Sequence, residues 1–318
     1  MKTRLAGAAA AIALAFGGAA KAQDFPSQPV EMTILFGSTA QTIGQLLAEL
    51  MSEHLDERVV PVSRPGGGGS VGYQHVQSAP ADGHNIVWNS NSISTTYYSG
   101  ATSFDYTAFE PIARISTEVA AVAVNANSGW ETLGDMAEAI REQGRPLRVG
   151  ASGRGSFTHL ATEAMLESIG LDDQAIHVPF DEGRAPVELL AGRIDAAVQW
   201  PGQFISHHNA GKLRILCITG TERVEQLPDV PTCNESGAEG FEMTMWRGLA
   251  APAGTPEHAI ETLEEAARLA VEDPRFQEAA KTIGFVPDFA PRDEFGEQIA
   301  ADDERLAELM TRLGLSER

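Results

Sequence analysis

The sequence predicts an α/β protein built from two lobes with a ligand cleft between them. Three observations lead to this prediction. Strand-like and helix-like segments alternate along the chain, the alternation falls into two units, and two extended apolar runs, 119–125 and 243–252, are suited to cross between the units. Alternating strands and helices form parallel sheets with right-handed crossovers and helices on both faces. Two lobes joined in this way leave a cleft, and such clefts hold ligands.

The first unit has the order strand, helix, strand, helix, strand. The expected elements, in order, cover residues 30–36, 42–55, 58–64, 71–79 and 84–90. The first helix is amphipathic, because its apolar side chains recur at the spacing of a single helix face. That face consists of Leu46, Leu47, Leu50 and Met51.

The second unit repeats this alternation from about residue 125, and the last third of the chain is helical. The expected strands of the second unit are 147–152, 175–180, 194–200 and 212–219, and its helices are 156–169 and 185–192. The C-terminal segments are amphipathic. One face carries Ile260, Leu263, Ala267 and Val271, and another carries Phe295, Ile299, Leu306 and Met310.

The N-terminus has the features of a secretory signal peptide. Lys2 and Arg4 precede a short apolar run, and Ala20 and Ala22 place small residues at positions −3 and −1 of a cleavage site. Cleavage is expected after Ala22, so residues 1–22 are assigned to the signal peptide. No later segment has the pattern of a membrane span.

The mature chain is strongly acidic. The signal peptide contains three basic residues and no acidic ones, so its removal changes the net charge from −21 to −24. This charge argues against binding to nucleic acid or anionic lipid. The chain has two cysteines, Cys217 and Cys233. Because spacing alone does not show that their geometry allows a disulfide, two separate buried thiols are the preferred interpretation.

The segment "PLRVGASGRGSFTHLATEAM", residues 146–165, places a glycine-rich turn between a strand and a helix. Glycines allow backbone N–H groups to turn toward one point, and the helix N-terminus with Ser156 near its cap adds partial positive charge. This arrangement suits a carboxylate as well as a phosphate. A tight turn without a ligand is the alternative. The second glycine-rich segment, "RPGGGGSVG" at 64–72, is interpreted as a structural turn.

Nucleotide, metal and hydrolase sites find little support. Thr158 stands where the third glycine of G-x-G-x-x-G belongs, and Arg154 interrupts G-x-S-x-G. The histidines lack the spacing of a metal site. Ser152, His159 and Asp195 could form a catalytic set on paper, but any protein of this size offers such a set. No cofactor is expected.

Several segments in one order carry a resemblance to a known family. They are "RPGGGGSVGYQHV…APADGHNIVW" (64–88), "FDYTAFEPIARI" (104–115), "GASGRGSFTHLATE" (150–163), "HVPF" (177–180), "AGKLRILCITGTERVEQLPDVPT" (210–232) and "GFEMTMWRGLAAPAGTP" (240–256). Over residues 24–315 the chain resembles the periplasmic substrate-binding proteins of tripartite tricarboxylate transporters, also called Bug receptors. The resemblance implies a two-lobed periplasmic binding protein fold, type II-like, with mostly parallel sheets and two crossover strands. Lobe 1 is expected over 23–122 and 249–318, and lobe 2 over 123–248.

The resemblance also implies where a ligand binds. In the family, two loops grip one carboxylate. They correspond here to 36–42 and to 152–156, with His159 just inside the following helix. The turn 89–92 and Gln199 border the cleft. The expected ligand-binding residues are Phe36, Ser38, Thr39, Gln41, Asn89, Ser90, Ser152, Gly153, Arg154, Gly155, Ser156, His159, Gln199 and Trp246.

Different roles are expected for these residues. Phe36 and Trp246 should form apolar walls. The hydrogen-bond donors to the carboxylate should be Ser38, Thr39, Ser152, Gly153, Gly155 and Ser156. The part of the ligand beyond this carboxylate should be selected by Gln41, Arg154 and Gln199.

Three departures from the family pattern bear on the ligand. Gln41 stands about where relatives carry an aspartate, which argues against an amino group held by a salt bridge. Arg154 could pair with a second carboxylate or project into solvent. Asp181 and Glu182 are expected at the rim, because they would repel an anion inside the cleft.

The resulting prediction is a monomeric periplasmic solute-binding protein, not an enzyme. It should capture a small carboxylate-bearing acid and deliver it to permease subunits in the membrane. A sensing role that feeds a signalling receptor uses the same cleft and is the first alternative. An exported hydrolase is the second.

Overall fold

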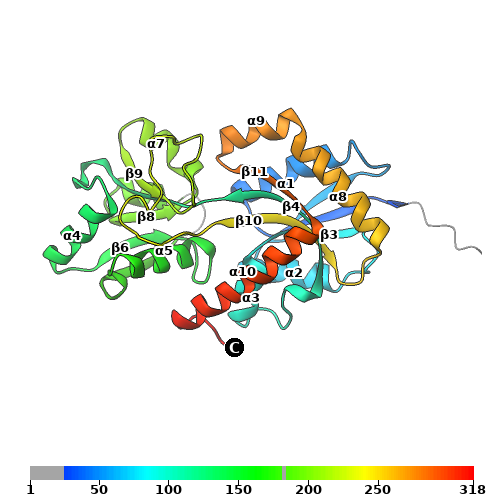
Figure 1. Cartoon of the computed structure of the whole chain (residues 1–318), viewed down its shortest axis with the longest axis horizontal. Helices are drawn as coiled ribbons and strands as arrows, with labels where there is room; N and C mark the ends of the chain where they lie inside the picture. The colour runs from blue at the N-terminus through cyan, green and yellow to red at the C-terminus, as the bar shows by residue number, and fades with distance from the viewer. Residues whose placement is uncertain (1–24, 181–183) are drawn as a thin grey trace, which may run out of the picture.

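The computed structural model describes residues 25–180 and 184–318, which form two lobes side by side (Figure 1). The predicted signal peptide, 1–22, and the expected rim residues Asp181 and Glu182 lie outside the described residues. Within the described ranges, no helix has the length and hydropathy needed to cross a membrane.

Lobe 1 contains a six-stranded sheet in the order β11-β4-β10-β3-β1-β2. Its strands are β1 (Val30–Ile34), β2 (Val59–Ser63), β3 (Asn85–Ser90), β4 (Phe109–Glu118), β10 (Met245–Pro252) and β11 (Val286–Pro291). Its helices are α1 (Ser38–Met51), α2 (Ser70–Gln77), α3 (Ser92–Tyr98), α8 (Glu257–Glu272), α9 (Pro274–Ile283) and α10 (Arg292–Arg312).

Lobe 2 contains a five-stranded sheet in the order β7-β6-β8-β5-β9. Its strands are β5 (Ala121–Asn125), β6 (Leu147–Ala151), β7 (Ala175–Pro179), β8 (Ala196–Gln199) and β9 (Leu213–Ile218). Its helices are α4 (Leu133–Gln143), α5 (Phe157–Ser168), α6 (Ala185–Leu190) and α7 (Ile205–Asn209).

The two-lobed α/β fold predicted from the sequence is confirmed, and both sheets are mixed. In lobe 1, β1 is parallel to β2 and β3, whereas β10 runs antiparallel to β3 and β4. In lobe 2, β5 runs antiparallel to β8 and β9. Two of the antiparallel strands, β5 and β10, occur where the chain passes between the lobes, from β4 into β5 and back through β10 (Figure 1). The third, β11, runs antiparallel to β4 at the edge of the sheet of lobe 1. By this pairing the lobes divide near residues 119 and 244, a few residues before the predicted boundaries.

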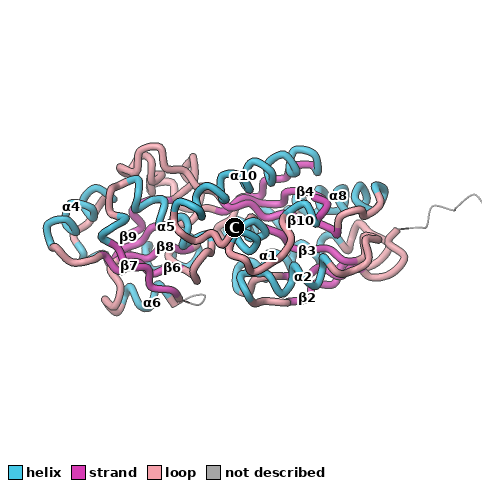
Figure 2. Tube along the Cα trace, turned by 90° about the horizontal axis from the view of Figure 1, so that it is seen from below, coloured by secondary structure: helices cyan, strands magenta, loops and turns pink. Residues whose placement is uncertain are grey.

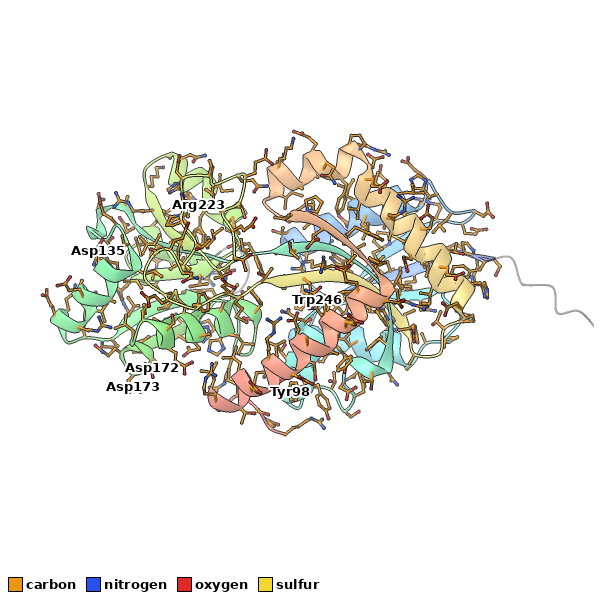
Figure 3. The ribbon with its side chains drawn as sticks, viewed as in Figure 1. Tyr98, Asp135, Asp172, Asp173, Arg223 and Trp246 are labelled. Atoms are coloured by element: carbon orange, nitrogen blue, oxygen red, sulfur yellow. A yellow bond between two sulfur atoms is a disulfide. The ribbon has the colours of Figure 1, made fainter. Side chains whose placement is uncertain are left out.

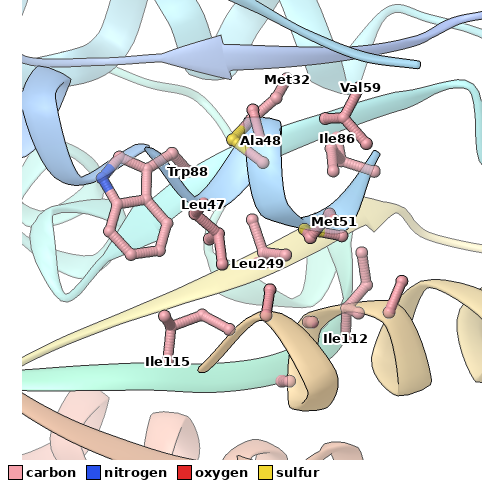
Figure 4. Packing of buried hydrophobic residues seen from close by; sticks show 14 of the residues in the cluster. Met32, Leu47, Ala48, Met51, Val59, Ile86, Trp88, Ile112, Ile115 and Leu249 are labelled. Carbon is pink, nitrogen blue, oxygen red and sulfur yellow. The ribbon is translucent and has the colours of Figure 1, made fainter. Parts of the chain in front are cut away.

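The core of lobe 1 lies between its sheet and the helices that cover it. Met32 and Trp88 from the strands meet Leu47 and Met51 from α1, and all four side chains are at most 1% exposed (Figure 4). The predicted apolar stripe of α1 is therefore the face that is buried on the sheet. The two C-terminal faces predicted from the sequence are likewise buried.

Helix α10 belongs to lobe 1 but also contacts lobe 2. Its residues Leu306 and Met310 form a buried cluster with Leu160 of α5. Arg312 makes an ion pair with Glu167 at 3.1 Å. In the views of Figures 1 and 2, α10 runs along lobe 1 toward the junction of the two lobes. The last helix is thus one of the elements that fix how the lobes sit relative to each other.

Cys217 and Cys233 form a disulfide, so the interpretation as two separate thiols is wrong. Cys217 lies near the end of β9, and the chain then loops back so that the N–H of Cys233 donates to the carbonyl of Ile218 at 2.8 Å. This return brings the two Cα atoms to 4.8 Å, which is within the range that a disulfide needs. Spacing alone could not show the return of the chain.

Removing the disulfide should lower the free energy of unfolding by about 3 kcal/mol. The bond closes a loop with a sequence separation of 16 residues, and a loop of this size restricts the unfolded chain by about that amount. The measurement is urea unfolding of the double variant Cys217→Ala/Cys233→Ala beside the oxidised wild type. Wild type in reductant serves as the control. Equal stability of variant and wild type would contradict the prediction.

Candidate functional site

A cavity of about 900 Å³ lies between the lobes. Parallel strands end at the same edge of a sheet, and the loops that follow them meet there. The wall from lobe 1 is formed by loops after β1 and β3 and by the turn 66–69, and the wall from lobe 2 by loops after β6, β7 and β8. Each glycine of the turn 66–69 has a positive φ, as a structural turn requires. The same four glycines also line the cavity.

Two long helices begin at this cavity. Helix α1 follows Gly37, which provides no side-chain cap, and Thr39 and Ala40 of its first turn line the cavity. The indole N–H of Trp88 donates to the carbonyl of Ala40 at 3.0 Å and so ties this turn to the core of lobe 1. Helix α5 starts in the opposite wall after Ser156. Both N-termini place partial positive charge at one space.

The loop before α5 is held together by its own hydrogen bonds. The N–H of Ser152 donates to Thr158 Oγ1 at 3.0 Å, and the N–H of Ser156 donates to the carbonyl of Gly153 at 3.0 Å. The N–H groups of Gly153 and Arg154 have no hydrogen-bond partner among the described residues. The loop therefore keeps a fixed shape and retains backbone donors for a ligand.

Two histidines whose rings lie tilted against each other support this loop. His159 Nδ1 accepts a hydrogen bond from the N–H of Gly155 at 3.0 Å, and His177 Nε2 lies 2.9 Å from the carbonyl oxygen of Ser152. The ring centroids are 4.0 Å apart. His159 is buried and does not line the cavity. His159 therefore lies behind the described lining, and its ring engages the Gly155 N–H.

The stability of the protein should depend on His177 in mildly acidic solution. Burial, followed by the charge of His159, lowers the pKa of His177 below its ordinary 6.5. The unfolded chain then binds this proton more readily than the folded protein, so stability falls as the pH drops below about 6.5. Urea unfolding from about pH 7.5 to 5.5 should show a weaker pH dependence for His177→Gln than for wild type. A hydrogen bond from His159 lowers the pKa of Glu163 below 4.5, so Glu163 does not titrate in this range. Identical slopes for variant and wild type would contradict this role.

The cavity has two charged side chains among its described lining residues. Both are arginines, Arg154 from the loop before α5 and Arg247 from β10, and no described lining residue is acidic. The chain as a whole has 44 acidic and 23 basic residues. The described lining thus carries two arginines and no acid, which departs from the acidic composition of the chain and favours an anion.

Arg247 is a residue that the sequence reasoning missed. It is 3% exposed and forms an ion pair with Glu118, which is equally buried. Successive side chains of a strand point to opposite faces. Met245 and Arg247 line the cavity, whereas Trp246 between them packs edge-on against Phe295, with 4.9 Å between ring centroids. Figure 3 labels Trp246, which lies on β10. Trp246, expected as an apolar wall, is therefore not part of the described lining.

Most of the other expected residues line the cavity. Two of them, Ser38 and Asn89, are not among its described lining residues. The lining set includes Phe36, Thr39, Gln41, Ser90, Ser152, Gly153, Arg154, Gly155, Ser156 and Gln199. Asn89 is buried behind the wall, where its Oδ1 accepts from Tyr73 at 2.7 Å and from the N–H of Ser90. Ser38 opens α1, and its side chain lies outside the described part of the chain.

The apolar part of the wall comes from residues next to the expected ones. Phe157 and Trp200 stack with 5.6 Å between ring centroids, and Phe180 and Met245 add further apolar surface. Phe180 ends the "HVPF" segment and Trp200 directly follows Gln199. Both residues therefore stand at strand ends that the sequence predicted, and this position could have identified them as lining residues.

A second hollow, of about 530 Å³, lies between α10, α5 and the segment 239–244. Its charged residues are Glu167, Glu239, Glu242, Asp302, Glu308, Arg305 and Arg312. Burial raises the pKa of Asp302. With more acids than arginines, this hollow is less suited to an anion than the cavity between the lobes.

Comparison with known proteins agrees with this geometry. Residues 43–315 match the Tripartite tricarboxylate transporter family receptor, TctC. The chain belongs to this family. A UPF0065 protein from the tcbD–tcbE intergenic region of Pseudomonas sp. (strain P51) is 31% identical over 287 residues, which cover 88% of this chain and 84% of that protein.

Solved structures share the fold of this TctC receptor. The periplasmic binding protein BugD has a TM-score of 0.79 at 27% identity, covering 92% of this chain and 100% of that chain. An R. palustris protein with adipate has a TM-score of 0.82 at 24% identity, covering 92% and 99%. The two-lobed architecture of the TctC receptor is therefore that of periplasmic binding proteins.

Proposed function

We propose that this TctC receptor is a periplasmic solute-binding protein that captures a small carboxylate-bearing organic acid between its lobes. The observation that carries the proposal is the charge of the cavity. Two helix N-termini and two arginines border it, and no described lining residue is acidic. The R. palustris structure with adipate supports the same ligand class by fold.

The proposed binding residues are those that line the cavity. The first turns of α1 and α5, with Thr39, Ser152 and Ser156, hold one carboxylate. Gln199 donates to Ser152 Oγ at 3.1 Å and orients that hydroxyl. Phe36, Phe180 and Trp200 cover the carbon chain of the ligand. Closure of the lobes over the ligand creates the state that permease subunits of a tripartite transporter recognise.

The protein acts in this proposal as a monomer, after export and removal of residues 1–22, and it leaves its ligand unchanged. The hydrolase alternative loses support from the structure, because Asp195 pairs with Arg145 and Arg148 on lobe 2 and is not among the lining residues. A sensing role uses the same cavity and remains the second candidate.

The test is ligand identification followed by direct binding. Native mass spectrometry of the gently purified protein should reveal a bound organic acid, and the released molecule should be chemically unchanged. Isothermal titration with that acid and with its neutral amide should show binding of the acid alone, because the site selects a carboxylate. Equal binding of acid and amide would contradict the proposal, as would turnover of the acid during incubation.

A further inference from the structure

Arg247 has donors that its ion pair does not use. Its Nε donates to Glu118 Oε1, and its Nη2 lies 3.4 Å from Glu118 Oε2. Its Nη1 is buried and has no hydrogen-bond partner among the described residues. Leaving part of a buried guanidinium unpaired costs free energy, so an acceptor that reaches this atom would be strongly favoured.

The surroundings of Arg247 point toward the cavity. Ser90 faces Arg247 across the β10–β3 ladder and lines the cavity, as Arg247 itself does. Ser116 faces it across the β10–β4 ladder, and the Oγ of this fully buried serine is also unpaired among the described residues. Residues opposite each other in a ladder share one face of the sheet. Ser116 thus shares the face of the sheet from which Arg247 borders the cavity.

The charge of the described groups around the cavity matches a dianion. Each helix N-terminus is equivalent to about half a positive charge. The two arginines with the two helix N-termini, reduced by the one negative charge of Glu118, come to about +2. A ligand with one carboxylate would leave part of this charge uncompensated.

We propose that Arg247, held in place by Glu118, is the specificity-determining residue that binds a second carboxylate of the ligand. The inference rests on the proposed function, in which the first carboxylate lies at the N-termini of α1 and α5. It assigns dicarboxylates as the preferred ligands, and it places the discriminating residue on a crossover strand and not in either of the two loops. Arg154, which is exposed and lies 3.5 Å from the carbonyl of Gly314 through its Nη2, compensates charge at the rim.

The experiment compares ligands of equal length with one or two carboxylates. Isothermal titration uses the dicarboxylates from succinate to suberate, each beside the monocarboxylate with the same number of carbon atoms. Wild type should bind the best dicarboxylate about 10- to 100-fold more tightly than its monocarboxylate partner, because a hydrogen-bonded charge pair is gained. The double variant Arg247→Met/Glu118→Leu removes the pair without leaving a buried charge. Its preference should fall below about threefold, because the loss of affinity falls mainly on the dicarboxylate.

A matched control separates binding from folding. Arg114 on β4 also forms an ion pair, with Asp288 at 2.8 Å, and does not line the cavity. The variant Arg114→Met/Asp288→Leu should keep the wild-type preference, and thermal unfolding checks that both double variants are folded. A preference that survives in Arg247→Met/Glu118→Leu would overturn the role of Arg247 while leaving the proposed function intact. Wild type that binds none of these acids would overturn the dicarboxylate assignment, whereas the proposed function is overturned only by the acid and amide comparison above.

Discussion

Arg247→Met alone should lower the free energy of unfolding by about 3–5 kcal/mol. The substitution leaves the Glu118 carboxylate without its cation at a position that is 3% exposed. Breaking a buried pair by removing one partner costs this much because the remaining charge is not compensated by water. Urea unfolding of wild type and variant measures the loss.

Two companion variants make the result specific. The double variant Arg247→Met/Glu118→Leu should recover most of the lost stability, because apolar replacement of a buried pair is often neutral. Arg114→Met should cost less than Arg247→Met, since Asp288 is 37% exposed and remains solvated without its partner. If Arg247→Met and Arg114→Met lose equal stability, the Glu118 pair is not the buried interaction described above.

Local sequence patterns were sufficient to predict most of the fold. The period-2 and period-3.6 spacings act within a few residues, so β1, β6 and the buried face of α1 followed from them directly. The start of α1 was missed by four residues, at 42 against Ser38. Its first turn has no apolar pattern, and Gly37 gives no side-chain cap from which a beginning could be read.

The site was less predictable because it depends on how distant segments meet. Glu118 and Arg247 are separated by 129 residues, and nothing near either one indicates the other. Strand alternation shows that Trp246 and Arg247 point to opposite faces, but the packing of β10 between the lobes decides which face borders the cavity. The disulfide depended in the same way on the return of the chain beside β9.

Ser152→Asp should weaken carboxylate binding at least about 100-fold. Ser152 lines the cavity at the loop before α5, so an aspartate there places a fixed negative charge where one ligand carboxylate is proposed to lie. Like charges brought together in a poorly hydrated site cost several kcal/mol, and every 1.4 kcal/mol is a factor of about ten in affinity. The affinity for the acid found in the purified protein, measured by isothermal titration, checks the prediction.

Ser152→Asn is the matched control, because asparagine has the shape of aspartate without its charge. Both side chains can still accept the hydrogen bond that Gln199 donates to Ser152 Oγ, so the loop should keep its support in both variants. The asparagine variant should therefore lose less than about tenfold in affinity, which is the effect of added volume alone. A difference of tenfold or more between the two variants isolates the charge, and it locates the ligand carboxylate at this loop. Equal losses in the two variants would mean that volume and not charge is responsible, and would place the carboxylate elsewhere in the cavity.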